Sequence, residues 1–160
     1  MVHNSWDGVI NEIKQYVKNA LQDDVARMVY STIQEYLLST VYAKTPEIYQ
    51  RTFEVLRALT VGVAKIEGNS VSVEIYIDSS KIIPYKTEDG WNSHMSFNGS
   101  AYNEELPYAL EFGTSGNTPY ITPNFQYMSK SKTEIEDRNL HIQRLQGYLK
   151  TKGLECIITS

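Results

Sequence analysis

The residue types that most often do chemistry in proteins are scattered along this chain. Its three histidines, His3, His94 and His141, stand in unrelated parts of the sequence, without the spacing of a metal site. The single cysteine, Cys156, lies in an apolar run, which predicts a small core residue and not an accessible nucleophile. No phosphate loop, dinucleotide fingerprint or nucleophile elbow occurs in the sequence. We therefore predict no catalytic residue, no metal ligand, no cofactor and no enzymatic activity.

Acidic residues are the remaining candidates for chemistry. Adjacent acids occur at positions 23–24, 88–89 and 104–105, and such pairs in loops are usually solvated. A small hydrolase that uses these acids or His94 stays as an alternative. Glu111 stands between Leu110 and Phe112, just before Gly113. Its carboxylate either ties down the glycine turn through backbone amides, the interpretation we favour, or pairs with a base of a neighbouring copy such as Arg51.

The charge of the chain is acidic overall but uneven. The net charge is -4, which argues against a strongly basic nucleic-acid binder. Residues 128–152 carry six Lys or Arg against three Asp or Glu. This basic stretch is either a solvated helix face or a surface attracted to the acidic body of another copy. A DNA-binding module built on Lys130, Lys132, Arg138 and Arg144 is a further alternative.

Length and hydropathy suggest one domain over residues 1–160 with no membrane association. A chain of 160 residues suits a single domain. No apolar run approaches the roughly 20 residues that span a bilayer. The first residues lack the basic and apolar regions of a signal peptide, so we expect synthesis in the cytoplasm.

The pattern of apolar residues predicts an α+β fold that opens with two helices. Ser5 is the expected N-cap of the first helix, and Asp23 or Asp24 that of the second. The apolar stripe of the second helix consists of Val25, Met28, Val29, Ile33, Tyr36, Leu37 and Val41.

The rest of the predicted fold is an antiparallel sheet of about three to five strands and a long C-terminal helix. Residues 55–66 and 70–78 read as a hairpin around Gly68. Residues 106–112 read as a strand, or as a short helix and then a strand. Thr122–Pro123 reads as a helix start, and Gly153 as the end of one continuous helix. Residues 154–159 are a candidate final strand.

Between the hairpin and residue 106, the stretch 79–105 predicts a long loop inserted in the sheet. It is polar and rich in turn residues, yet it contains Trp91, Met95, Phe97 and Tyr102. These side chains show no period that would place them on a core face. We interpret the loop as a contact with a neighbouring subunit; a loop folded over its own core is the alternative.

Two short motifs, in order, resemble the HK97 gp10-like family of phage head–tail connector, neck and tail-completion proteins. That family has Tyr-x-Arg-Thr-Gly-x-Leu after its N-terminal helices, where this chain has Tyr49-Gln50-Arg51-Thr52-Phe53-Glu54-Val55-Leu56. A hairpin and Tyr-Ala-x-x-Val-Glu-x-Gly-Thr follow in the family, and this chain has Tyr108-Ala109-Leu110-Glu111-Phe112-Gly113-Thr114. A proline-marked helix comes next. The resemblance covers residues 45–152 and departs at Phe53, which replaces the glycine, and in the length of the loop.

The resemblance implies a structural virion protein that forms a ring, a hexamer or dodecamer, at the junction of capsid and tail. Its partners would be other phage neck, connector and tail proteins, and DNA would pass through the lumen without specific binding. A tail terminator ring that caps the tail tube is the alternative. As interface residues we predict Trp91, Met95, Phe97, Tyr102, Arg51, Glu111 and Phe112.

Overall fold

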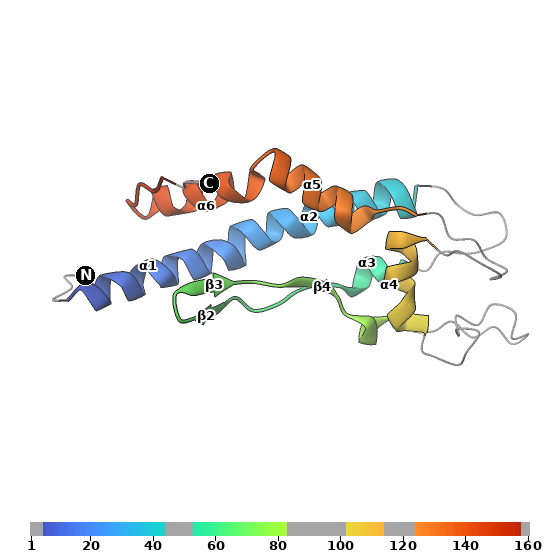
Figure 1. Ribbon diagram of the computed structural model, residues 1–160, viewed down its shortest axis with the longest axis horizontal. Coiled ribbons are helices and arrows are strands. Elements are labelled where there is room, and N and C mark those ends of the chain that lie inside the picture. The colour runs from blue at the N-terminus through green and yellow to red at the C-terminus, as the bar shows by residue number, and fades with distance from the viewer. Residues whose placement is uncertain (1–4, 44–52, 83–101, 114–123, 158–160) are drawn as a thin grey trace, which may run out of the picture. The chain divides into compact units, whose positions relative to one another are not determined.

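The fold class is α+β, as the sequence predicts (Figure 1). The structure, a computed structural model, describes residues 5–43, 53–82, 102–113 and 124–157, and in residues 102–104 the backbone alone. The chain divides into two compact units. Unit 1 consists of Met1–Ser31, Val61–Ile75 and Glu134–Ser160. Unit 2 consists of Thr32–Thr60 and Tyr76–Thr133. The single domain predicted over residues 1–160 stays a prediction.

The N-terminal part of the chain is helical without interruption. Helix α1 (Trp6–Ala20) begins at Ser5, whose side chain accepts a hydrogen bond from the Gly8 amide at 3.3 Å, so the predicted N-cap is confirmed. The π-helical turn η1 (Leu21–Val25), helix α2 (Ala26–Tyr36) and a second π-helical turn, η2 (Leu37–Val41), follow directly.

The predicted second N-cap at Asp23 or Asp24 is therefore wrong. Both aspartates lie inside η1, where the helix continues and Ala20 and Val25 are buried. A π-helical turn holds one residue more than an α-helical turn and so rotates the apolar stripe about the axis. This shift keeps the stripe from Val25 to Val41 buried or half-buried without a break in the helix.

A hairpin follows, as predicted, but it is shorter than the apolar pattern suggests. Strands β2 (Lys65–Glu67) and β3 (Ser70–Ser72) pair antiparallel with Ile66 opposite Val71, around Gly68 at φ 59°. Strands β1 (Leu59–Val61) and β4 (Ile75–Ile77) pair with each other in a separate two-stranded sheet. In the described residues the sheet thus consists of two two-stranded parts. Within residues 71–77 the apolar side chains are half-buried and the alternate ones exposed, as predicted.

The start of the predicted hairpin is instead helix α3 (Glu54–Ala58). Val55 and Ala58, three residues apart, are both buried, which is a helical spacing. Phe53 precedes the helix with φ 58°, in the left-handed region, and its ring stacks on Tyr42 at a centroid distance of 4.5 Å. The position where the phage family has glycine therefore has the backbone conformation that favours glycine.

Within unit 1, α1 lies along the β2–β3 hairpin and along α6 (Leu140–Thr151), as Figure 1 shows. The Lys14 ammonium donates to the Gly68 carbonyl at 2.8 Å and to Asn69 Oδ1 at 3.0 Å. Gln22 reaches the chain between β1 and β2: its Oε1 accepts from the Ala64 amide at 2.7 Å, and its Nε2 donates to the Gly62 carbonyl at 3.2 Å. The N-terminal helical segment thus holds the hairpin at two places, at its turn through Lys14 and at the residues between β1 and β2 through Gln22.

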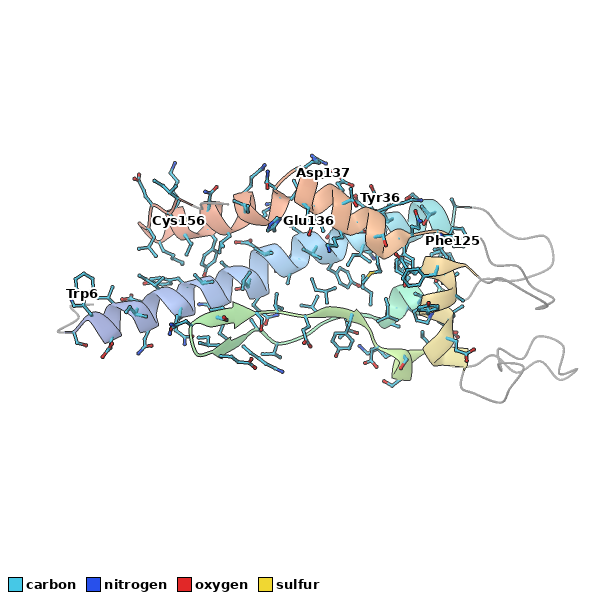
Figure 2. All side chains as sticks on the ribbon, viewed as in Figure 1. Trp6, Tyr36, Phe125, Glu136, Asp137 and Cys156 are labelled. Carbon is cyan, nitrogen blue, oxygen red and sulfur yellow. The ribbon has the colours of Figure 1, made fainter. Side chains whose placement is uncertain are left out.

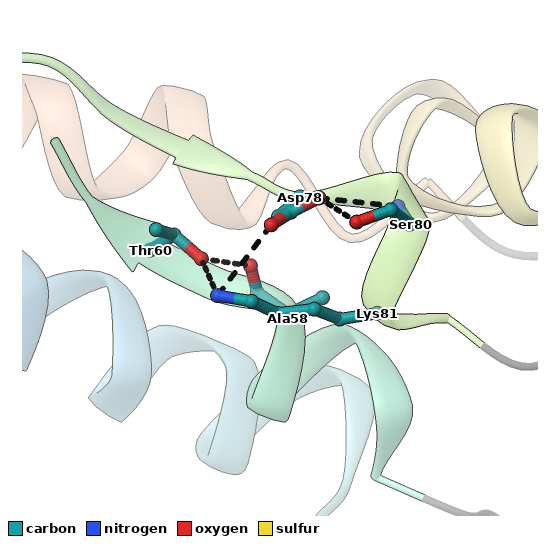
Figure 3. A network of polar contacts seen from close by, with 5 residues as sticks. All are labelled: Ala58, Thr60, Asp78, Ser80 and Lys81. Atoms are coloured by element: carbon teal, nitrogen blue, oxygen red, sulfur yellow. Dashed lines mark hydrogen bonds and ion pairs between the residues drawn. The ribbon is translucent and has the colours of Figure 1, made fainter.

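Within unit 2, the end of β4 is joined to β1 by the polar network in Figure 3. The Asp78 amide donates to the Ala58 carbonyl at 2.8 Å, and the Asp78 carboxylate accepts from Ser80. Lys81 pairs with Asp78 at 3.5 Å and donates to Thr60 Oγ1 at 2.7 Å. The hydrogen bond from Ser80 is the main cause that lowers the pKa of Asp78 below its ordinary value. The 3-10 turn η3 (Ser79–Lys81) begins here, so the predicted loop over 79–105 does not start at residue 79.

The predicted strand at residues 106–112 is wrong, because these residues belong to helix α4 (Tyr102–Phe112). Its last turn ends at Gly113, with φ 78° and an amide that donates to the Ala109 carbonyl at 2.8 Å. An apolar run of seven residues does not by itself distinguish a strand from a helix. Residues 102–105 are therefore helical and not loop, whereas residues 83–101 lie outside the described residues.

The single long helix predicted for residues 123–152 is also wrong. Residues 124–126 are not helical, helix α5 spans Tyr127–Asp137, and α6 begins after Asn139 at φ 50°. Asparagine tolerates this left-handed conformation better than most residues, which explains why the break falls there. Gly153 ends α6 as predicted: its amide and that of Leu154 close back on Lys150 and Leu149. Residues 154–157 are not a strand.

Candidate interaction surface

The junction of α4 and α5 in unit 2 is built around one buried carboxylate. Glu111 is only 5% exposed. Its Oε2 accepts the Met128 amide at 2.8 Å, and its Oε1 accepts both the amide of Ser129, at 2.9 Å, and the Ser129 hydroxyl. The first amides of a helix have no partner inside the helix. Glu111, seventeen residues away in sequence, therefore caps the N-terminus of α5.

The backbone reinforces this cap. The amides of Phe125 and Gln126 donate to the carbonyls of Leu110 and Glu111, each at 3.1 Å. Gln126 has φ 52°, in the left-handed region, immediately before the first residue of α5. A negative charge at a helix N-terminus is also favoured by the helix dipole. The end of α4 and the start of α5 are thus joined by main-chain and side-chain bonds at once.

Tyr127 fills the space behind the cap. It is 1% exposed, and its hydroxyl donates to the Pro107 carbonyl at 3.4 Å. Burial raises the pKa of Tyr127 well above its ordinary value, and the negative charge of Glu111 raises this pKa further. The ring therefore stays neutral at physiological pH and serves as a packing residue.

The outer side of α4 carries an exposed aromatic pair. Tyr108 and Phe112, four residues apart, are 66% and 56% exposed, and their ring centroids lie 4.6 Å apart. Together with Ile77, Met128 and Lys132 they line an open depression of about 640 Å³. We call this surface the aromatic depression. Because Glu111 fixes α4 against α5, the two rings stand on a rigid base.

The structure brings two of the predicted interface residues together and leaves others outside its description. Glu111 and Phe112 lie at the aromatic depression. Tyr102 is the first residue of α4. Trp91, Met95, Phe97 and Arg51 lie outside the described residues, so the predicted subunit contacts stay predictions. As favoured from the sequence, Glu111 binds backbone amides, but those of α5 and not those of the glycine turn.

Sequence reasoning missed Tyr108 as a surface residue. The signal was present, because Tyr108 and Phe112 are spaced i and i+4, and such residues share one face of a helix. The strand interpretation concealed this, since residues four apart also share a face of a strand, but at a distance that prevents ring contact. The partner of Glu111 had no local signal at all.

The candidate metal-ligating residues form no cluster in the described part of the chain. No three or more His, Cys, Asp or Glu side chains in the described ranges lie close enough to hold a metal ion. His141 is half-buried in α6, and its Nδ1 has no hydrogen-bond partner among the described residues. Cys156 is half-buried and free. His3 and His94 lie outside the described residues, and a hydrolase that uses His94 is not tested.

Several basic residues of the stretch 128–152 have partners in the chain itself. Lys130 donates to the Phe125 carbonyl at 2.9 Å. Arg138 forms an ion pair with Glu134 at 2.6 Å, and the Lys152 ammonium lies 5.2 Å from the centroid of the Tyr148 ring. These contacts favour an ordinary solvated helix face over a dedicated nucleic-acid surface. None of the described helices has the length and apolar character needed to cross a membrane.

The described part of the chain is thus an α+β fold with an exposed aromatic pair on helix α4. The chain belongs to the YomN family, whose model matches residues 5–151. No curated protein and no solved structure matches the chain significantly.

Proposed function

We propose that this protein is a structural component of the phage head–tail interface, a neck or tail-completion protein that assembles into a ring. The observation that carries the proposal is the aromatic depression. Two large rings are exposed side by side, and Glu111, one of the three residues between them in the helix, is buried and fixed. Exposed aromatic side chains on a rigid base are typical anchors of protein–protein contacts. This role requires neither a catalytic step nor a cofactor.

The motif positions shared with the HK97 gp10-like family support the proposal, because each has a physical task here. Phe53, at the position of the family's glycine, has a positive φ. Gly113, at the second glycine, has φ 78° and ends α4. Glu111, at the family's glutamate, caps α5. Backbone conformations and caps of this kind are features that a common fold would retain, even where the residue itself changes, as at Phe53.

The charge of the chain supports the same proposal. A ring through which DNA passes should not grip phosphates, and a net charge of -4 suits such a lumen. In this proposal the protein resides in the virion at the head–tail junction after synthesis in the host cytoplasm. Its partners are further copies of itself and the neighbouring connector and tail proteins.

The proposal is tested by measuring the mass of the assembled protein over a series of concentrations. Phe112→Ser and Tyr108→Ser remove exposed apolar area from the depression and should shift the assembly toward monomer without unfolding it. Tyr76→Ser is the matched control, since Tyr76 is an exposed aromatic residue of unit 2 that does not line the depression. Assembly unaffected by Phe112→Ser and Tyr108→Ser would contradict the role of this surface. A chain that stays monomeric and is absent from purified particles would contradict the function.

A further inference from the structure

Helix α1 in unit 1 carries a second exposed apolar surface, which the proposed function does not yet use. Trp6, Ile10, Ile13, Val17 and Ala20 follow one another at spacings of four and three, the spacing of a helical seam. The exposure of this seam falls along the helix, from 82% at Trp6 through 44% at Ile10 and 39% at Ile13 to 0% at Ala20. We call its open end, Trp6, Ile10 and Ile13, the α1 ridge.

The α1 ridge ends in the indole of Trp6, which is 82% exposed. Figure 2 shows Trp6 at the N-terminal end of α1, away from the β2–β3 hairpin. Isolated exposed apolar residues are common on soluble proteins. A tryptophan continuous with two exposed isoleucines is not isolated, and such a patch marks a contact surface.

The two exposed surfaces complement each other in shape and charge. The aromatic depression is concave, and its volume of about 640 Å³ is ample for an indole. Asp7 follows Trp6 in the first turn of α1 and is exposed, and Lys132 lines the depression. An acid beside the protruding ring and a base beside the receiving surface favour one orientation of approach.

Ring formation gives a reason for two different surfaces. A subunit that contacts copies on both sides of a ring uses one surface for each neighbour, which is a heterologous contact. We propose that the α1 ridge of one copy docks into the aromatic depression of the next copy, with the Trp6 indole inserted beside Tyr108 and Phe112. This inference rests on the proposed function, since it names the partner surface within the ring. The occupant of the depression is thus a second copy of this chain.

The contact is tested by mixing two variants that are each defective on one side. Trp6→Ser removes the ridge but keeps the depression, and Phe112→Ser does the reverse. Both side chains are largely exposed, so both variants should fold. Each variant alone should remain monomeric. An equimolar mixture should form a species of twice the monomer mass and none larger, because one intact ridge and one intact depression are left.

Other modes of contact give different results. If two ridges contact each other, Phe112→Ser alone assembles, and if two depressions do so, Trp6→Ser alone assembles; either result overturns the inference. A mixture that stays monomeric while the wild-type chain assembles overturns it as well, but leaves the proposed function standing. A wild-type chain that never assembles and is absent from particles overturns both.

A disulfide trap detects the contact even when it is weak. Asp7→Cys in one chain and Met128→Cys in another, each combined with Cys156→Ser, keep Trp6, Tyr108 and Phe112 and place one cysteine beside the ridge and one in the depression. A mixture of the two chains should form a cross-linked heterodimer on oxidation. Replacing Met128→Cys with Tyr76→Cys is the control and should give no cross-link above background. Cross-linking of the Asp7→Cys chain with itself, or equal yields from the two mixtures, would contradict the docking.

Discussion

Gln22 in unit 1 and Glu111 in unit 2 perform the same task with different chemistry. Each projects from a helix and binds two backbone groups of a segment distant in sequence. Gln22 meets one amide and one carbonyl, so it needs an acceptor and a donor, which a side-chain amide provides. Glu111 meets two amides, so it needs two acceptors, which a carboxylate provides. The polarity of the unpaired backbone groups therefore determines the residue type.

The two contacts differ in energy because they differ in charge and burial. The bonds to Glu111 are charge-assisted and lie at a helix N-terminus, in a buried setting. Those of Gln22 are neutral and partly buried. The unit 2 junction should consequently be the more sensitive of the two to substitution.

The largest effect is expected for Glu111→Ala, which leaves the Met128 and Ser129 amides without their acceptor. We expect a loss of about 3 kcal/mol in the free energy of unfolding. Chemical denaturation measures the loss, and hydrogen exchange of the two amides should accelerate. Glu35→Ala, at an exposed acid on helix α2, is the control. An equal, small effect of both substitutions would show that the cap has little energetic importance.

Isosteric changes at Glu111 and Gln22 test whether the polarity of the backbone groups determines the residue type. Glu111→Gln and Gln22→Glu keep shape but each places one wrong group against the backbone, a donor against an amide or an acceptor against a carbonyl. Each should lower the free energy of unfolding by about 1–2 kcal/mol. Gln146→Glu, at a glutamine with a single long hydrogen bond of 3.4 Å, should change stability far less. If neither Glu111→Gln nor Gln22→Glu changes the free energy of unfolding, the polarity of the backbone groups does not determine the residue type.

The buried Tyr127 of unit 2 should make the free energy of unfolding depend on pH. Burial raises the pKa of Tyr127 above its ordinary value of about 10, so the unfolded chain loses this proton first as the pH rises. The stability contributed by neutral Tyr127 is complete below about pH 10 and is lost above it, by about 1 kcal/mol at pH 11. Denaturation at pH 8 and pH 11 should show this loss in the wild-type chain, and less of it in Tyr127→Phe. Equal losses in both chains would reject the assignment.

The smallest effect is expected in unit 1 at Lys14, whose ammonium binds the hairpin turn on the surface. Lys14→Met keeps the aliphatic stem and removes the charge. Exposed contacts of this kind contribute little, so the free energy of unfolding should change by about 0.5 kcal/mol or less. A loss as large as that of Glu111→Ala, measured by the same denaturation, would show that the unit 1 contact is as important for stability as the unit 2 junction.

The difference between the units also explains what the sequence could predict. Helix α1 and the β2–β3 hairpin follow from local signals, the Ser5 cap, the apolar stripe and the turn at Gly68. The α4–α5 junction depends on a carboxylate and two amides that lie 17 and 18 residues further along the chain, and no local pattern indicates that they meet. For the same reason Phe112 was predicted as an interface residue on a strand, while its true neighbour on the helix, Tyr108, was missed. The break between α5 and α6 had only a weak local signal, because asparagine at position 139 permits a left-handed conformation but does not require one.

An image of the assembled phage particle in which this chain is located decides whether the protein forms a ring at the head–tail junction. We expect a closed ring of copies there, with Tyr108 and Phe112 of each copy buried against a neighbour. A ring at the far end of the tail would instead favour the tail terminator function. Particles that lack the chain would contradict the proposed function, and a ring in which both aromatic side chains face solvent would contradict the role of the aromatic depression.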